Sequence, residues 1–140
     1  MHHIIYLSRA TYPFTDAQLQ DLLAQARPYN AAHGITGVLL YGNDQFLQLV
    51  EGEETEVRAL YEHIRQDSRH QDITTFADKA IAERAFPDWS MAYQPLKTGR
   101  FQELIGYLSP AIVHFENANM SLTDQQLLQL LRTFVLPEEA

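Results

Sequence analysis

The sequence predicts an α+β domain of the ferredoxin-like type, a largely antiparallel βαββαββ sheet with two helices on one face. Five segments have the period-two alternation or the β-branched and aromatic content of strands. Two further segments, after the first and third strands, have apolar residues at helical spacing. The resulting crossovers are expected to be right-handed, which places both helices on the same face of the sheet. A flat ligand could lie between those helices.

The first strand is expected over residues 4–8 and the first helix over residues 16–33. In the strand, alternation places three residues on one face: Ile4, Tyr6 and Ser8. The helix follows Thr15, which forms a capping-box pattern with Gln18, and it stops before a glycine. Pro28 predicts a kink or an early helix end, because proline lacks the N–H group and crowds the preceding turn.

Two strands, a second helix and two final strands are expected after the first helix. The strands at residues 35–41 and 46–51 flank a hairpin turn at residues 42–45. The second helix is expected over residues 53–67, where four apolar residues share one side: Val57, Leu60, Tyr61 and Ile64. The last two strands are expected over the following ranges: 73–81 and 89–96.

Composition and charge describe an acidic chain of 140 residues with a formal net charge of −8 and no cysteine. We therefore expect no disulfide, thiolate nucleophile or zinc–thiolate site, in agreement with a cytoplasmic location. Lys and Arg are scattered, so nucleic acid is not an expected partner, because phosphate binding needs a basic surface. No apolar run suits a membrane span or a signal peptide. The histidines lack the spacing of a metal site, and no nucleophile or phosphate-loop motif indicates an enzyme.

Several polar or polarisable side chains occupy positions where the local pattern predicts plain core. They are Tyr6, Asn30, Gln48, Trp89 and Met91. Gln48 is the least expected, because a buried amide with unmet hydrogen-bonding groups costs about 1–3 kcal/mol. A bond to neighbouring backbone or to water could satisfy it. Tyr6 alone is compatible with an ordinary core tyrosine, Asn30 with a helix end, and Met91 with core packing.

As a set, these residues and their surroundings resemble the BLUF family of blue-light sensors that use flavin. The resemblance runs from about His2 to Leu96. It rests on four stretches in the order of the family: residues 3–8, 30–37, 46–52 and 86–91. No single stretch is specific, but the four together are.

The resemblance implies that FAD binds non-covalently between the two helices. It implies that Tyr6 gives an electron and a proton to the light-excited flavin, and that Gln48 bridges Tyr6 and the flavin N5. It also implies that Asn30 binds the pyrimidine edge of the flavin and that Met91 relays the rearrangement of the glutamine. Trp89 would point either toward or away from the flavin.

Five further residues are expected to contact the cofactor. Ile64 and Ile35 are expected to pack on the flavin ring, although each is also compatible with an ordinary core residue. Arg69 and His70 match the basic pair of the family after the second helix and could face the ribityl-phosphate tail or solvent. Tyr29 stands where familiar members have asparagine or histidine, so it could stack on the ring or turn to solvent.

The chain after residue 97 lies outside the resemblance. We expect residues 1–97 to form the photosensor domain and residues 98–140 to form a helical extension for output and oligomerisation. Its apolar stripes need a partner surface, either the back of the sheet or a second subunit: Phe101, Leu104, Ile105 and Leu108, then Leu128, Leu131 and Phe134. A homo-oligomer, most simply a two-fold dimer, is therefore expected.

The sequence thus predicts a non-enzymatic, cytoplasmic blue-light photoreceptor that signals through its last strand and C-terminal helices to a partner protein. The alternative from another class is a light-insensitive ferredoxin-like module for ligand binding or assembly, because this fold hosts many functions. A light-induced red shift that recovers in the dark would distinguish the two.

Overall fold

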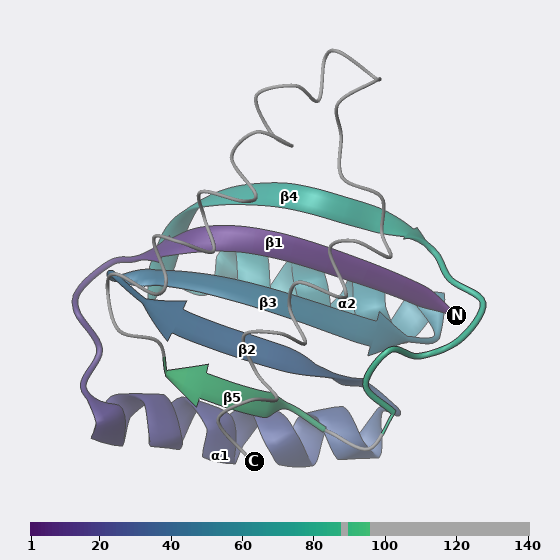
Figure 1. The fold of residues 1–140 in the computed structure, drawn as a ribbon, viewed down its shortest axis with the longest axis horizontal. Coiled ribbons are helices and arrows are strands. Elements are labelled where there is room, and N and C mark those ends of the chain that lie inside the picture. The colour runs from purple at the N-terminus through teal and green to yellow at the C-terminus, as the bar shows by residue number, and fades with distance from the viewer. Residues whose placement is uncertain (88–89, 96–140) are drawn as a thin grey trace.

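The computed structural model describes residues 1–87 and 90–95, which form seven elements in the predicted βαββαββ order (Figure 1). The elements are β1 (His2–Ala10), α1 (Asp16–Ala32), β2 (Thr36–Gly42), β3 (Gln45–Gly52), α2 (Glu54–Gln66), β4 (His70–Ala80) and β5 (Ala92–Pro95).

The strands of the described residues form one sheet in the order β4-β1-β3-β2-β5. β1 lies between β3 and β4 and is antiparallel to both, and β3 is also antiparallel to β2. β5 runs parallel to β2 at the edge of the sheet. Each crossover, β1-α1-β2 and β3-α2-β4, therefore joins two parallel strands that have one antiparallel strand between them. This is the ferredoxin-like arrangement, and the predicted fold class is confirmed.

Both helices pack against one face of the sheet and share a core with it. Leu19 and Leu23 of α1 and Val57 of α2 belong to the same buried cluster as Ile4 and Tyr6 of β1. Figure 1 shows α1 along the β5 side of the sheet and α2 behind β1 and β3. The face of the sheet between the two helices is therefore where a ligand site can form.

The hairpin between β2 and β3 fixes the register of the residues on that face. Asn43 and Asp44 adopt positive φ angles of 51° and 59°, as a two-residue hairpin turn requires. The resulting pairing places Gln48 opposite Leu39 on β2 and opposite Tyr6 on β1. A slip of one residue would turn Gln48 to the other face of the sheet.

Helix α1 starts as predicted but does not end early. Thr15 and Gln18 form the expected capping box, and the helix continues through Pro28 to Ala32. Proline removes one helical hydrogen bond, but buried side chains on both sides of it, Leu23 and Asn30, hold the helix to the core. The prediction of an early end was therefore wrong.

Some strand limits differ from the predicted ones, and part of the prediction lies outside the described residues. β1 and β4 begin earlier than predicted, because pairing with each other extends both strands beyond their apolar centres. β5 begins at Ala92 rather than at residue 89. Trp89 and the C-terminal helices expected within residues 98–140 lie outside the described part of the chain, as does the domain limit at residue 97. Neither helix of the described part is long and apolar enough to cross a bilayer.

Candidate functional site

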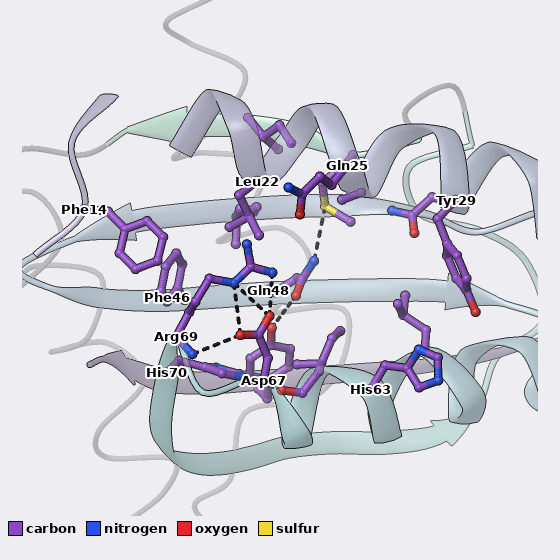
Figure 2. Close-up of a pocket in the computed structure, with 18 residues that line it drawn as sticks. Phe14, Leu22, Gln25, Tyr29, Phe46, Gln48, His63, Asp67, Arg69 and His70 are labelled. Carbon is purple, nitrogen blue, oxygen red and sulfur yellow. Dashed lines mark hydrogen bonds and ion pairs between the residues drawn. The ribbon is translucent and has the colours of Figure 1, made fainter. Parts of the chain in front are cut away.

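A cavity of about 260 Å³ lies between α1 and α2, with β1, β2 and β3 as its floor. Figure 2 shows Phe14 and Arg69 at one end, Tyr29 and His63 at the other, and Gln48 on the strand between them. Eight of the residues predicted for the site line this cavity: Tyr6, Tyr29, Asn30, Gln48, Ile64, Arg69, His70 and Met91. Their elements are far apart along the chain, so the crossovers of the fold bring them together.

Tyr6, Gln48 and Met91 form a buried chain of hydrogen bonds across the floor. The Tyr6 hydroxyl donates to Oε1 of Gln48, and Nε2 of Gln48 donates to the Sδ atom of Met91 at 3.5 Å. All three side chains are less than 9% exposed. A thioether is a weak acceptor, so the Tyr6 hydroxyl is the partner that fixes the orientation of the amide.

The environment of Tyr6 keeps its phenol protonated. Burial raises the pKa of Tyr6 far above its ordinary value, and the neighbouring Tyr61 and the charge of Asp67 raise it further. The ring of Tyr61 lies 5.7 Å from that of Tyr6, and the ring of His70 lies 6.0 Å away. The neutral phenol therefore keeps the proton that it donates to Gln48, and any loss of this proton must be driven by another process.

Asn30 projects from the last turns of α1, and only one of its two amide groups is hydrogen-bonded within the described structure. Its Nδ2 donates to the main-chain oxygen of Ser90 at 2.8 Å. Its Oδ1 is buried and has no hydrogen-bond partner among the described residues. An acceptor left in this state costs about 1–3 kcal/mol, so a ligand that presents an N–H group there would be stabilised.

Arg69 and Asp67 form an ion pair at the end of the cavity marked by Phe14. Nη2 of Arg69 lies 2.5 Å from Oδ2 of Asp67, and Nε contacts both carboxylate oxygens at 3.0 Å. The Arg69 guanidinium therefore lowers the pKa of Asp67 below its ordinary value. Because the two charges largely cancel, this end of the cavity has less positive potential than Arg69 alone would supply.

His70 lines the cavity with its ring rather than with a free nitrogen. Its Nδ1 lies 2.7 Å from Oγ of Ser8, and its Nε2 lies 2.5 Å from the main-chain oxygen of Ile64. These two contacts hold the ring between β1 and α2. Both nitrogens are engaged with the protein, so we expect His70 to contact a ligand mainly by packing.

Tyr29 belongs to the opposite end of the cavity, where it stacks on His33. The two ring centroids are 4.1 Å apart, and Nδ1 of His33 lies 2.6 Å from Oε2 of Glu56. Glu56 is in the first turn of α2, so this contact connects the two helices. Tyr29 thus lines the cavity while it stacks on a side chain of its own helix end, and the expected contact of Tyr29 with a flavin stays a prediction.

Two predicted residues are not placed in the cavity. Ile35 is buried in the core just before β2 and is not among the lining residues. Trp89 lies outside the described residues. Sequence reasoning also missed lining residues that look like ordinary amphipathic helix positions, among them Leu22, Gln25, His63 and Asp67. The run Asp67-Ser68-Arg69 was the available signal for the ion pair, because an acidic residue two positions from a basic one can turn back onto it.

Comparison with known proteins assigns this chain to one family of domains. The family described as sensors of blue light using FAD, BLUF, matches residues 1–92. This chain belongs to the BLUF family, whose domains are described as sensing blue light with FAD.

Solved structures and curated relatives agree with the family. BlrB, a BLUF protein in its dark state, superposes with a TM-score of 0.71 and 27% identity, covering 98% of this chain and 96% of that chain. BlsA in its photo-activated state superposes with a TM-score of 0.70 and 29% identity, covering 96% of this chain and 94% of that chain. The photoactivated adenylate cyclase subunit beta of Euglena gracilis is 39% identical over 89 residues, which are 63% of this chain and 10% of that protein. The chain thus spans about a tenth of the length of these cyclase subunits.

The lining of the cavity fits the ring of a flavin. Apolar residues of both helices line the cavity, among them Leu22 and Leu23 of α1 and Leu60 and Ile64 of α2. A flat ring bound between the helices would therefore be buried away from water. The free Oδ1 of Asn30 matches an N–H group of the kind at the pyrimidine edge of a flavin. The fit therefore rests on shape and on one specific unmet acceptor.

Replacing Asn30 by alanine is expected to weaken FAD binding by about fivefold to tenfold, because one hydrogen bond to the ligand is worth about 1 kcal/mol or slightly more. Titration of apoprotein with FAD, followed by quenching of flavin fluorescence, measures the change. Gln20→Ala, an exposed replacement on the same helix, is the control and should bind FAD like the unmodified protein. Equal affinity in Asn30→Ala would mean that Asn30 does not bind the flavin.

Proposed function

We propose that this chain is a non-enzymatic light switch in which Tyr6 and Gln48 convert absorption by FAD into a change of hydrogen bonding. The observation that carries this proposal is the buried Tyr6–Gln48–Met91 chain on the floor of the cavity. Bound FAD supplies absorption of blue light and a transient acceptor for one electron and one proton. The chain supplies the donor, the switching amide and the exclusion of water.

Tyr6 is the proposed donor because a phenol can release an electron and a proton together and regain both. Its raised pKa rules out proton loss by simple ionisation near neutral pH, so oxidation must accompany deprotonation. Tyr6 is reduced and reprotonated in the return step, and no net chemistry remains. A cycle of this type needs no substrate and no external reductant.

Gln48 is the proposed switch because its amide has an oxygen that accepts hydrogen bonds and an NH2 group that donates them. When the phenol oxygen loses its proton, it becomes an acceptor and no longer suits Oε1 of Gln48 as its partner. Rotation or tautomerisation of the amide then presents a donor to that oxygen. The contact with Met91 opposes this change little, because the sulfur is only a weak acceptor. When the proton returns, the rearranged amide is left in place and the flavin has a different hydrogen-bonding partner.

Output is proposed to leave the site through Met91 and β5 toward the segment after residue 96 and a partner protein. Met91 directly precedes β5, which pairs with β2 at the edge of the sheet. Relatives named as a cyclase and as an antirepressor indicate that BLUF domains occur with different effectors. Homo-oligomerisation and a cytoplasmic location stay predictions.

Illumination of the purified protein is the experiment that tests the proposed function. We expect the flavin absorption bands to shift to the red under blue light and to return fully in the dark, without bleaching. Repeated light–dark cycles recorded by absorption spectroscopy measure both the shift and its reversibility. A light-insensitive spectrum, or a bleached flavin of the reduced type, would contradict the switch.

A further inference from the structure

Glu51 is a fully buried carboxylate on β3, three residues after Gln48 and on the opposite face of that strand. Its Oε1 accepts a hydrogen bond from the main-chain N–H of Ala85 at 2.8 Å. Its Oε2 accepts one from the N–H of Phe86 and one from the Thr36 hydroxyl, each at 2.8 Å. A buried carboxylate is tolerated only when such donors surround it, so these contacts are a specific requirement rather than incidental packing.

Arg84 strengthens the same attachment. Its Nη2 donates to the main-chain oxygen of Gly34 at 2.6 Å, and its Nη1 donates to Oγ1 of Thr36 at 3.0 Å. Nη1 also reaches the main-chain oxygen of Glu51 at 3.3 Å. Residues 84–86 are therefore fixed to the start of β2 and the end of β3.

Ser90 and Met91, at the far end of the same β4–β5 connection, are held at the candidate site. Asn30 donates to the main-chain oxygen of Ser90, and Nε of Arg27 donates to that of Met91 at 3.1 Å. The Sδ atom of Met91 accepts from Gln48. Only three residues separate Phe86 from Ser90, so their Cα atoms can lie at most roughly 14 Å apart.

The switch and the anchor share one rigid strand. β3 is paired with β1 on one side and with β2 on the other. Gln48 and Glu51 therefore keep a fixed separation while the β4–β5 connection spans from the carboxylate to the amide.

We propose that Glu51 is a positioning residue of the light reaction: it fixes Ala85 and Phe86 and thereby sets the contact between Met91 and Gln48. This inference rests on the proposed function. The Gln48–Met91 hydrogen bond is weak, so a small displacement of the sulfur is enough to lose it. That bond favours the dark orientation of the amide, so loosening the anchor removes a contact that draws the rearranged amide back, and the signalling state decays more slowly in the dark.

The test is Glu51→Gln, which keeps the size of the side chain but turns an NH2 group toward one of the three donors. We expect FAD to stay bound, the red shift to form, and dark recovery to become about fivefold slower, which corresponds to about 1 kcal/mol. In the dark, amide hydrogen exchange of residues 84–86 and also of residues 90–92 should rise. Glu54→Gln makes the same chemical change at an exposed carboxylate paired with Arg58, and it should alter neither readout.

A second variant and a double variant separate positioning from general loosening. Arg84→Ala removes the guanidinium contacts but keeps the Glu51 carboxylate, so it should change dark recovery in the same direction as Glu51→Gln, by a smaller factor. It replaces Glu51→Gln in the test if that variant does not fold. In a Met91→Ala background, Glu51→Gln should have no further effect on dark recovery, because the proposed route passes through the sulfur. Additive effects on recovery would overturn the inference.

The exchange measurement also separates this inference from the proposed function. Faster exchange that is confined to residues 84–86 would overturn the positioning role even in a protein that responds normally to light. If the unmodified protein shows no red shift, the proposed function fails, while dark exchange still decides whether Glu51 fixes residues 90–92. Unchanged dark recovery in Glu51→Gln, with a normal red shift, would likewise refute the inference.

Discussion

Replacing Gln48 by leucine is expected to abolish the reversible red shift completely while FAD stays bound. Leucine fills most of the volume of glutamine but has neither donor nor acceptor, so no hydrogen bond near the flavin can rearrange. The variant leaves the buried Tyr6 hydroxyl without its acceptor, which costs about 1–3 kcal/mol, but the apolar side chain offsets part of that cost. Difference spectra before and after blue light, together with the FAD content per protein, measure both parts of the prediction.

The same experiment with Tyr6→Phe identifies the donor. Phenylalanine keeps the ring but cannot release an electron and a proton, so the red shift should disappear as it does in Gln48→Leu. Tyr61→Phe is the matched control, because Tyr61 lies beside Tyr6 but bonds to Oγ1 of Thr75 at 2.6 Å rather than to Gln48. A normal photocycle in Gln48→Leu would contradict the switch, and one in Tyr6→Phe would move the donor role to Tyr61 or Tyr29.

The fold was predictable because its signals are local and agree with one another. The capping box of Thr15 and Gln18 fixes the start of α1, and the hairpin turn after Gly42 fixes the register of β2 and β3. Because crossovers between parallel strands are right-handed, few arrangements of the helices relative to the sheet then remain. Of the two outcomes expected at Pro28, a kink or an early helix end, the early end does not occur, because burial of Leu23 and Asn30 on either side of the proline outweighs the local rule.

The candidate site was predictable where a residue is unusual for its position, and not where its role depends on distant partners. Gln48 stands out in an apolar strand, and it does lie beside Tyr6 and Met91. Glu51 stands out in the same strand, but its partners, the N–H groups of Ala85 and Phe86, are backbone atoms that no side-chain pattern reveals. The stacking of Tyr29 on His33 depends on the geometry of a helix end, which a sequence pattern does not specify.

Removing FAD is expected to lower the melting temperature by about 10 °C or more relative to protein with FAD at a thousandfold excess over its dissociation constant. A ligand that binds only the folded state at this excess adds about 4 kcal/mol to the free energy of unfolding. For a domain of this size, each kcal/mol corresponds to about 3–5 °C. The shift should be large because the cavity lies inside the core cluster that joins α1, α2 and the sheet, so an empty cavity leaves apolar side chains unpacked.

Thermal unfolding followed by circular dichroism, with apoprotein at increasing FAD concentrations, measures this shift. The melting temperature should rise with the logarithm of the FAD concentration above saturation, as mass action requires. At any fixed FAD concentration the rise should be smaller in Asn30→Ala and unchanged in Gln20→Ala, because Asn30 has an unmet acceptor in the cavity and Gln20 does not line it. Equal melting temperatures of apoprotein and FAD-loaded protein would place the cofactor outside the core, and an undiminished shift in Asn30→Ala would place it away from α1.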